Sequence, residues 1–251
     1  MIVHVREDVA ESSHPADMYF NLLRGTILNV FYANLIQRCI VHGEDTWAGR
    51  FHYSGTGIDA LNNIRFCCED VIKNKIPGDF LEAGIWRGGA VIYMAALAKF
   101  WKEDRTIWAV DSFQGMPKPN PDCPHEITDY SNLTGLIVPL SEVRDACSKF
   151  EVLEKITFVP GWFNESLQDL EIKQIAVLRL DNDYYESTLM TIRKFYPLIP
   201  VGGWIIVDDY DCVPGAKTAI DQFREEMHIK DQMYRMNKSE NVGIYWQKST
   251  L

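Results

Sequence analysis

Apolar residues along the chain follow a helical period in one region and short continuous runs in another. From residue 16 to about residue 41, and again over residues 58–75, apolar side chains recur every three or four positions, which predicts amphipathic helices. Polar, glycine-bearing sequence up to residue 57 separates the two. We expect residues 1–75 to form a helical segment that precedes a main domain over residues 76–251.

Beyond residue 75, short β-branched runs alternate with helical patterns, as in a doubly wound α/β sheet. The expected strands are 79–83, 106–110, 156–159, 175–180, 203–207, 233–236 and 242–247, and the expected helices are 90–102, 140–149, 186–196 and 214–228. Only residues 237–241 separate the last two strands, so these strands must pair antiparallel. A seven-stranded sheet with an antiparallel last strand is the layout of the class I S-adenosylmethionine-dependent methyltransferases, a Rossmann-like α/β fold.

Two of the expected strands end abruptly in acidic residues. Strand 175–180 leads directly into Asp181, and strand 203–207 leads into Asp208 and Asp209. In the methyltransferase layout these strands are neighbours about 4.8 Å apart, so their terminal carboxylates can converge. Hard oxygen ligands suit Mg²⁺, and like charges this close need a cation or protons. The sequence therefore predicts a magnesium site, with capping or loop carboxylates as the alternative reading.

The candidate catalytic groups are Asp181, Asp183 and His125. Asp183 follows Asp181 by two positions and can serve as a general base for a hydroxyl that the metal has acidified. His125 is the rival base, and it lies in the segment 114–139, which has five prolines and little periodicity. A long loop of this kind after a strand indicates a lid over the substrate or a disordered insertion. We favour the lid.

A glycine-bearing turn and an acidic strand end predict a cofactor site. The turn after strand 79–83 lets the backbone approach a ligand at a helix N-terminus, although a simple tight turn would look the same. Asp111 ends the next strand, where it can accept both hydroxyls of an adenosine ribose or cap the following segment. Residues 161–163 can close over an adenine ring or pack in the core. The candidate cofactor-binding residues are Glu82, Ala83, Gly84, Trp86, Arg87, Gly88, Asp111, Ser112, Gly161, Trp162, Phe163 and Asp181.

Six segments, taken in order, resemble the macrocin O-methyltransferase family, whose members methylate sugar hydroxyls on macrolide and aminocoumarin natural products. They are YFNLLR (19–24), EAGIWRGG (82–89), VDSFQGMP (110–117), VPGWFNES (159–166), LRLDNDYYEST (178–188) and GGWIIVDDY (202–210). The resemblance covers most of the chain. Two departures are Asn182, where the family usually has glycine, and residues 42–56, which do not follow the family pattern.

The resemblance implies the cofactors and the assembly. It implies S-adenosylmethionine as methyl donor, Mg²⁺ held by Asp181, Asp208 and Asp209, and Asp183 at the position of the proposed base. It also implies a homodimer or homotetramer in which the N-terminal helical segment acts as a lid and in oligomerisation. The departure at Asn182 is expected to leave the chemistry intact, and the departure at residues 42–56 affects the identity of the acceptor.

Composition narrows the range of partners and compartments. A net charge of −10 with a pI near 5.1 argues against nucleic acid and anionic membranes as partners, because both require a basic surface. The six cysteines have neither zinc-site spacing nor the density of a disulfide scaffold, so we expect reduced thiols in the cytoplasm. Charged residues near the N-terminus replace the apolar stretch of a signal peptide, and no run of 18 apolar residues occurs.

These observations predict a Mg²⁺-dependent O-methyltransferase that uses S-adenosylmethionine and acts on a sugar hydroxyl of a glycosylated natural product. A catechol or phenol methyltransferase is the nearest alternative, since it would use similar carboxylates. A nicotinamide oxidoreductase would also place Asp111 on a ribose, but the chain lacks G-x-G-x-x-G. A non-catalytic nucleotide-binding protein is disfavoured by the acidic strand ends. The acceptor and the hydroxyl cannot be named from the sequence.

Overall fold

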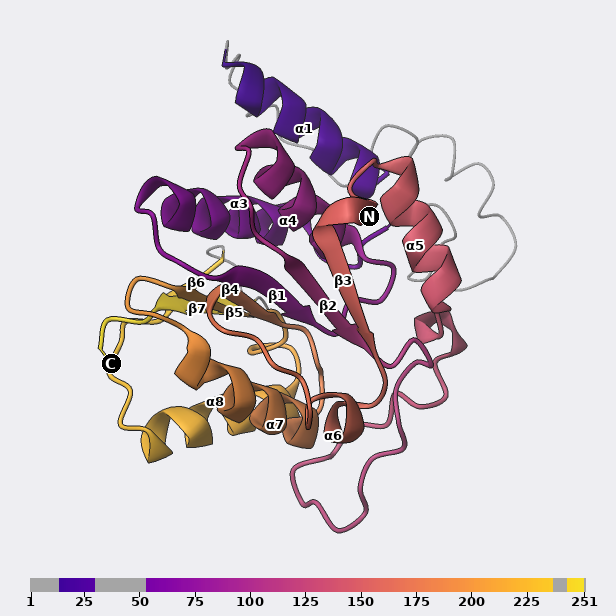
Figure 1. Cartoon of the computed structure of the whole chain (residues 1–251). Coiled ribbons are helices and arrows are strands. Elements are labelled where there is room, and N and C mark those ends of the chain that lie inside the picture. Colours follow the sequence, from indigo (N-terminus) through magenta and orange to yellow (C-terminus); the bar gives the residue numbers. More distant parts are fainter. Residues whose placement is uncertain (1–13, 30–52, 237–242, 251) are drawn as a thin grey trace, which may run out of the picture.

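A seven-stranded sheet runs through the centre of the computed structural model, which describes residues 14–29, 53–236 and 243–250 (Figure 1). The strand order is β3-β2-β1-β4-β5-β7-β6. The first five strands are parallel, and β7 pairs antiparallel with both β5 and β6. The strands are β1 (Asp79–Ala83), β2 (Ile107–Asp111), β3 (Ile156–Pro160), β4 (Ile175–Leu180), β5 (Trp204–Val207), β6 (Tyr234–Arg235) and β7 (Ile244–Gln247).

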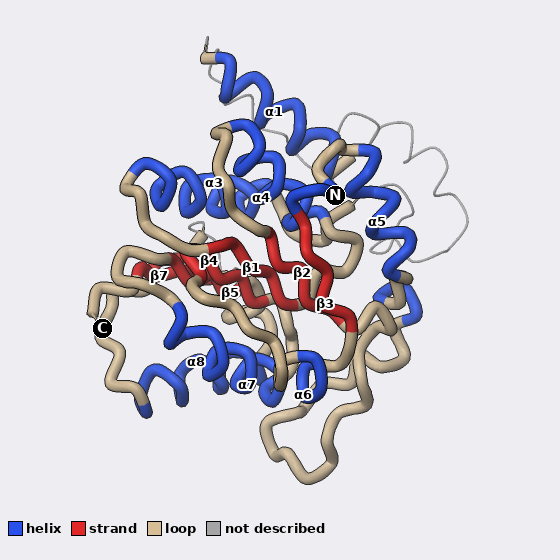
Figure 2. Tube along the Cα trace, viewed as in Figure 1, coloured by secondary structure: helices blue, strands red, loops and turns tan. Residues whose placement is uncertain are grey.

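Helices cover both faces of the sheet (Figure 2). One face carries α1 (Pro15–Ile27), α3 (Ile58–Lys73), α4 (Gly89–Phe100) and α5 (Leu140–Lys149), and the other carries α6 (Phe163–Ser166), α7 (Tyr185–Phe195) and α8 (Pro214–Glu226). Short 3₁₀ turns lie at Thr134–Leu136, Leu153–Lys155 and Tyr196–Leu198. Because both faces are covered, all residues of β4 and β5 are buried, which explains their continuous apolar sequence.

The sequence predicted the sheet well and the first helix poorly. Each of the first five strands begins and ends within one residue of its expected bounds. The expected helix 16–41 ends at Ile27, because Asn29 adopts a left-handed backbone with φ of 56°. Strand β6 is shorter than expected, and the predicted turn 237–241 lies outside the described residues, as do residues 30–41. The division into residues 1–75 and 76–251 remains a prediction, and α3 packs on α4, β4 and β5.

The order of the strands fixes where ligands can bind. The chain moves outward from β1 to β3 on one side and from β4 to β5 on the other, so β1 and β4 lie side by side at a topological switch point. Their carboxyl ends, with those of β2 and β5, point to the same edge (Figure 1). All the predicted acidic strand ends therefore meet at one edge of the sheet.

The described residues also bear on the expectations about cysteines and membranes. Cys67, Cys68, Cys123, Cys147 and Cys212 are free thiols, and Cys39 lies outside the described residues. Within the described ranges, no helix combines the length and the apolar character that crossing a bilayer demands.

Candidate active site

A cavity of about 870 Å³ opens at the carboxyl edge of the parallel strands. Loops that follow the first five strands line it, together with the segment 114–139. The predicted site residues that line it are Glu82, Gly84, Trp86, Asp111, Ser112, Gly161, Trp162, Phe163, Asp181, Asp183, Asp208 and Asp209. The structure thus brings together the predicted cofactor, metal and base residues in one cavity.

Four predicted site residues do not line this cavity. Ala83 is buried within β1, and Gly88 caps the start of α4 with φ of 81°. Arg87 places its guanidinium over the Trp86 ring, 4.5 Å from the ring centroid. His125, the fourth, packs its ring against that of Tyr185.

The loop after β1 is held by the carboxylate of Asp111. Asp111 Oδ2 accepts hydrogen bonds from the backbone N–H groups of Ile85 (2.8 Å) and Trp86 (3.2 Å), and Oδ1 accepts one from Phe113 (2.7 Å). Burial raises the pKa of Asp111, while these backbone N–H groups oppose the rise. The acid that was expected to bind a ribose therefore also fixes the glycine turn, a task that the sequence pattern did not reveal. Ribose binding remains a prediction.

Gly84 lets the ends of β1 and β4 approach closely. Its φ is +81°, and a Cβ atom at this position would lie 1.8 Å from the carbonyl oxygen of Asp181. The backbone N–H of Asp181 donates to the carbonyl of Ala83 over 2.9 Å, which continues the pairing of the two strands. A residue with any side chain at position 84 would push the cofactor loop away from the acidic strand end.

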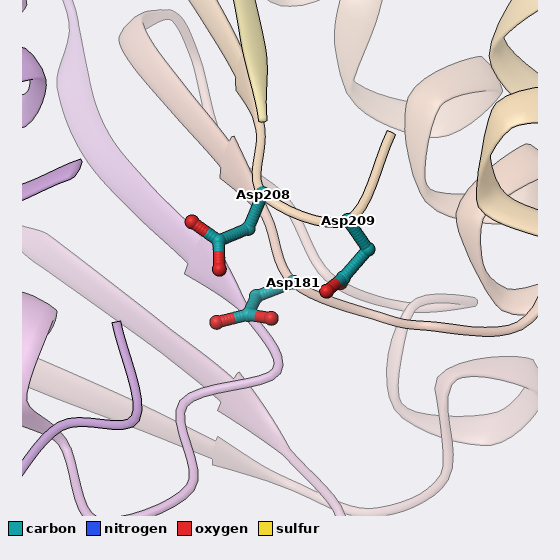
Figure 3. A group of neighbouring side chains, drawn as sticks. All are labelled: Asp181, Asp208 and Asp209. Carbon is teal, nitrogen blue, oxygen red and sulfur yellow. The ribbon is translucent and has the colours of Figure 1, made fainter. Parts of the chain in front are cut away.

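Three aspartates converge as the sequence predicted. One carboxylate oxygen each from Asp181, Asp208 and Asp209 lies within 4.8 Å of the others (Figure 3). Burial and neighbouring carboxylates raise the pKa of Asp209 well above its usual range, and its buried Oδ2 has no hydrogen-bond partner among residues 14–29, 53–236 and 243–250. Closely spaced oxygens with an unpaired buried acceptor among them fit a small divalent cation such as Mg²⁺.

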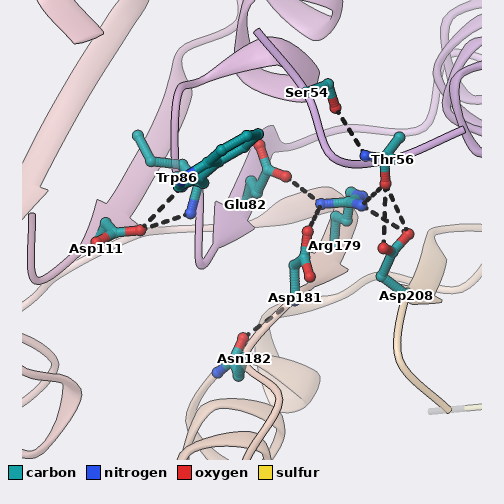
Figure 4. A network of polar contacts seen from close by, with 10 residues as sticks. Ser54, Thr56, Glu82, Trp86, Asp111, Arg179, Asp181, Asn182 and Asp208 are labelled. Atoms are coloured by element: carbon teal, nitrogen blue, oxygen red, sulfur yellow. Dashed lines mark hydrogen bonds and ion pairs between the residues drawn. The ribbon is translucent and has the colours of Figure 1, made fainter. Parts of the chain in front are cut away.

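A buried arginine joins this cluster, and the sequence analysis did not identify it. Arg179 on β4 is 1% exposed and binds Glu82, Asp181 (2.7 Å) and Asp208 (2.6 Å) (Figure 4). Its Nη2 also donates to Thr56 Oγ1 over 2.7 Å. Although burial opposes its charge, Asp208, Asp181 and Glu82 raise the pKa of Arg179. A charged residue inside an otherwise apolar strand was the available signal.

Glu82 is the buried partner of Arg179 on the neighbouring strand. Glu82 is 1% exposed, and burial raises the pKa of its carboxyl group to about 8, although the charge of Arg179 opposes this rise. Its Oε2 lacks a hydrogen-bond partner among the described residues. Glu82 was predicted as a cofactor-binding residue, and the structure shows that it also belongs to the acidic cluster through its ion pair with Arg179.

Of the two candidate bases, only Asp183 lines the cavity. Burial first, and then Asp181 and Asp208, raise the pKa of Asp183 to about 8, and its φ is 59°. His125 packs its ring on Tyr185, with 4.6 Å between the ring centroids, and does not line the cavity. The geometry favours Asp183.

The segment 114–139 closes one side of the cavity through contacts with two other loops. The backbone N–H of Tyr130 donates to Tyr184 Oη over 2.8 Å, and the two rings stack with 5.9 Å between centroids. Trp86 Nε1 donates to the carbonyl of Gly135 over 2.9 Å. The segment thus joins the cofactor turn to the loop that follows Asp183, and Tyr130 and Tyr184 are lining residues that the sequence analysis did not single out.

Comparison with known proteins agrees with this geometry. The family model for macrocin O-methyltransferase (TylF) matches residues 7–248. The chain belongs to the macrocin O-methyltransferase family. It is a methyltransferase with the S-adenosylmethionine-dependent fold, so the oxidoreductase and non-catalytic alternatives are excluded.

Members of the family are similar over almost their whole length. Demethyldecarbamoylnovobiocin O-methyltransferase of Streptomyces niveus is 36% identical over 257 residues, covering 97% of each chain. Mycinamicin III 3''-O-methyltransferase of Micromonospora griseorubida is 32% identical, covering 93% of this chain and 97% of that enzyme. The solved structure of the O-methyltransferase NovP matches with a TM-score of 0.84 at 36% identity, over 94% of this chain and all of that one.

A more distant structure confirms the fold. The calicheamicin methyltransferase CalS11 matches with a TM-score of 0.63 at 16% identity, over 94% of both chains. The expected class I architecture, with its antiparallel last strand, is therefore correct.

Proposed function

We propose that this family member transfers a methyl group from S-adenosylmethionine to a sugar hydroxyl of a glycosylated natural product, with Mg²⁺ bound at the acidic cluster. The observation that carries the proposal is the convergence of Asp181, Asp208 and Asp209 within 4.8 Å in the lining of a cavity of about 870 Å³. Two relatives support it, since one is named for O-methylation of demethyldecarbamoylnovobiocin and the other for 3''-O-methylation of mycinamicin III.

The charge of the cavity supports a neutral acceptor. The acidic side chains that line it are Glu82, Asp111, Glu126, Glu165, Asp181, Asp183, Glu186, Asp208 and Asp209, whereas the lysine and arginine side chains that line it are Lys118 and Arg179. A nucleotide-activated sugar brings a diphosphate, which these carboxylates repel. A sugar already attached to an aglycone carries no such charge, and Met116, Leu133 and Met190 offer it an apolar surface.

Separate groups of cavity residues bind the donor, hold the metal ion and accept the proton. The turn from Gly84 to Trp86, held by Asp111, cradles the donor, and Trp162 contributes an aromatic wall. Asp181, Asp208 and Asp209 would hold Mg²⁺, which supplies Lewis-acid activation of the acceptor hydroxyl when bound. Asp183 accepts the proton that the hydroxyl loses, and the cavity aligns that oxygen with the methyl group. A homodimer or homotetramer stays a prediction.

The test is a methyl-transfer assay with labelled S-adenosylmethionine and a panel of acceptors. The panel consists of demethyldecarbamoylnovobiocin, mycinamicin III, a nucleoside diphosphate rhamnose and catechol, and each acceptor is assayed with Mg²⁺ and with EDTA. We expect Mg²⁺-dependent methylation of a glycoside and none of the nucleotide sugar. Turnover of catechol alone would support the phenol alternative, and full turnover in EDTA would refute the metal-assisted mechanism.

A further inference from the structure

We infer that Arg179 is a positioning residue that acts as the built-in counter-ion of the metal site. It holds Asp181 and Asp208 in place when no divalent ion is bound, and the ion competes with it for the same two carboxylates. The inference rests on the proposed Mg²⁺ site and goes beyond it, because it assigns a function to a residue outside the ligand set.

The first observation is that one guanidinium connects four separate parts of the chain. Its Nη1 donates to Glu82 on β1 and to Asp181 after β4, and its Nη2 contacts Asp208 after β5 and Thr56 just before α3. Thr56 Oγ1 in turn donates to Asp208 over 3.1 Å (Figure 4). A planar fork with several donors can hold these partners in fixed directions, whereas a single ammonium cannot.

The second observation is that the cluster is only partly neutralised. Asp181 and Asp208 face Arg179, but two buried oxygens, Asp209 Oδ2 and Glu82 Oε2, have no hydrogen-bond partner within the part of the chain that the structure describes. Each of the two paired aspartates belongs to the trio that would bind the ion. A divalent ion therefore enters a site whose carboxylates are already oriented, and it has to share two of them with Arg179.

The contacts of Arg179 determine how the negative charge of the acidic cluster is balanced. Carboxylates this close repel each other strongly when no cation compensates them, and a buried uncompensated charge destabilises the fold. Arg179 provides the compensation in the ion-free protein. Removal of its charge should leave the fold dependent on a divalent ion, and it should strengthen the binding of that ion because a competing positive charge is gone.

The test compares wild-type protein with Arg179→Met, without donor or acceptor present. The melting temperature is measured in EDTA and in saturating Mg²⁺, and the affinities for Mg²⁺ and Mn²⁺ are measured by calorimetry. In Arg179→Met we expect a lower melting temperature in EDTA and about tenfold tighter binding of the ion. By linkage, Mg²⁺ should then raise its melting temperature by about 3 to 5 °C more than it raises that of the wild type.

A purely structural function predicts a different pattern. In that case Arg179→Met loses the same stability in EDTA and in Mg²⁺, with unchanged or weaker ion binding, and the inference is overturned. The matched control is Arg193→Met, which removes an exposed ion pair with Glu226 and should leave the response to Mg²⁺ unchanged.

A second variant covers the case in which Arg179→Met does not fold in either buffer. Arg179→Gln removes the positive charge but keeps a polar amide with hydrogen-bond donors, so its response to Mg²⁺ should exceed that of the wild type; an unchanged response overturns the inference. If the wild type binds no divalent ion, the metal site of the proposed function fails together with this inference. If the wild type binds the ion, and substitutions at position 179 do not alter the affinity for it, only this inference fails.

Discussion

The cavity has a proposed donor half, made of Asp111 and the turn 84–86, and a proposed metal half, made of Asp181, Asp208 and Asp209. The two halves satisfy their carboxylates in opposite ways. In the donor half, Asp111 accepts hydrogen bonds from three backbone N–H groups, so these groups compensate its negative charge. In the metal half, Asp181 and Asp208 share one arginine, while Asp209 has a buried oxygen that finds no hydrogen-bond partner in the described ranges of the chain. The donor half is complete as it stands, and the metal half is short of positive charge.

The difference indicates which half needs a cation to function. Backbone N–H groups are fixed by the fold, so the donor turn is preorganised for binding. Crowded carboxylates gain most from a divalent ion, because it relieves repulsion that one guanidinium leaves uncompensated. We therefore expect changes in the metal half to affect turnover and changes in the donor half to affect donor binding.

Asp209→Asn should have the largest effect, on turnover. It removes one of the three carboxylates that converge in the cavity lining. We expect methyl transfer to fall by about 1,000-fold, equivalent to about 4 kcal/mol, with affinity for S-adenosylhomocysteine within about twofold of wild type. Asp211→Asn, which touches exposed Arg235 instead, is the matched control. Retained turnover in Asp209→Asn would contradict the metal assignment.

Gly84→Ala should break the contact between the two halves. The new Cβ would meet the Asp181 carbonyl at 1.8 Å in a backbone with φ of +81°. We expect a loss of at least about 3 kcal/mol in the free energy of unfolding, measured by denaturant titration, and loss of donor binding. At Gly57 a Cβ would meet nothing within 4 Å, so Gly57→Ala should cost no more than about 1 kcal/mol. Equal losses in the two variants would refute the close approach.

Asp111→Asn should weaken donor binding without affecting the ion. An amide can accept with its oxygen, but its NH₂ group would face a backbone N–H that now has no acceptor. We expect affinity for S-adenosylhomocysteine to fall about 30-fold, equivalent to about 2 kcal/mol, and affinity for Mg²⁺ to stay the same. Calorimetry measures both constants. A loss of Mg²⁺ affinity as large as the loss of donor affinity would mean that the halves are not separate.

Tyr184→Phe should have the smallest effect. It removes the hydroxyl that accepts the backbone N–H of Tyr130 in segment 114–139. We expect KM for the acceptor to rise about fivefold, or about 1 kcal/mol, with kcat little changed. The exposed Tyr234 supplies the control Tyr234→Phe. An unchanged KM would show that this contact does not hold the segment over the acceptor.

The sequence predicted the sheet because the sequence patterns that indicate strands are local. Apolar runs that end in acids identify parallel strands, and adjacency of β4 and β5 then brings Asp181 close to Asp208 and Asp209. The end of the first helix at Ile27 was not predictable, since the apolar period continues beyond it. Periodicity shows which face of a helix is apolar but not where the chain turns away.

Side-chain partners were beyond the reach of the sequence for a different reason. Arg179, Glu82 and Thr56 are far apart in the chain, and only the strand register and the turn before α3 bring them together. Likewise, the position of Asp111 at a strand end is readable, but its hydrogen bonds to the turn after β1 depend on a backbone with left-handed residues such as Trp86. Pairing of this kind is a property of the fold.

The separation of the two halves is tested most directly by calorimetric titration of the wild-type protein with S-adenosylhomocysteine, in EDTA and in Mg²⁺, and by a separate titration with Mg²⁺. The preformed donor half predicts affinities for S-adenosylhomocysteine that agree within about twofold in the two buffers, together with one bound Mg²⁺ per chain. Binding of S-adenosylhomocysteine only when Mg²⁺ is present, or no binding of Mg²⁺ at all, would contradict this account.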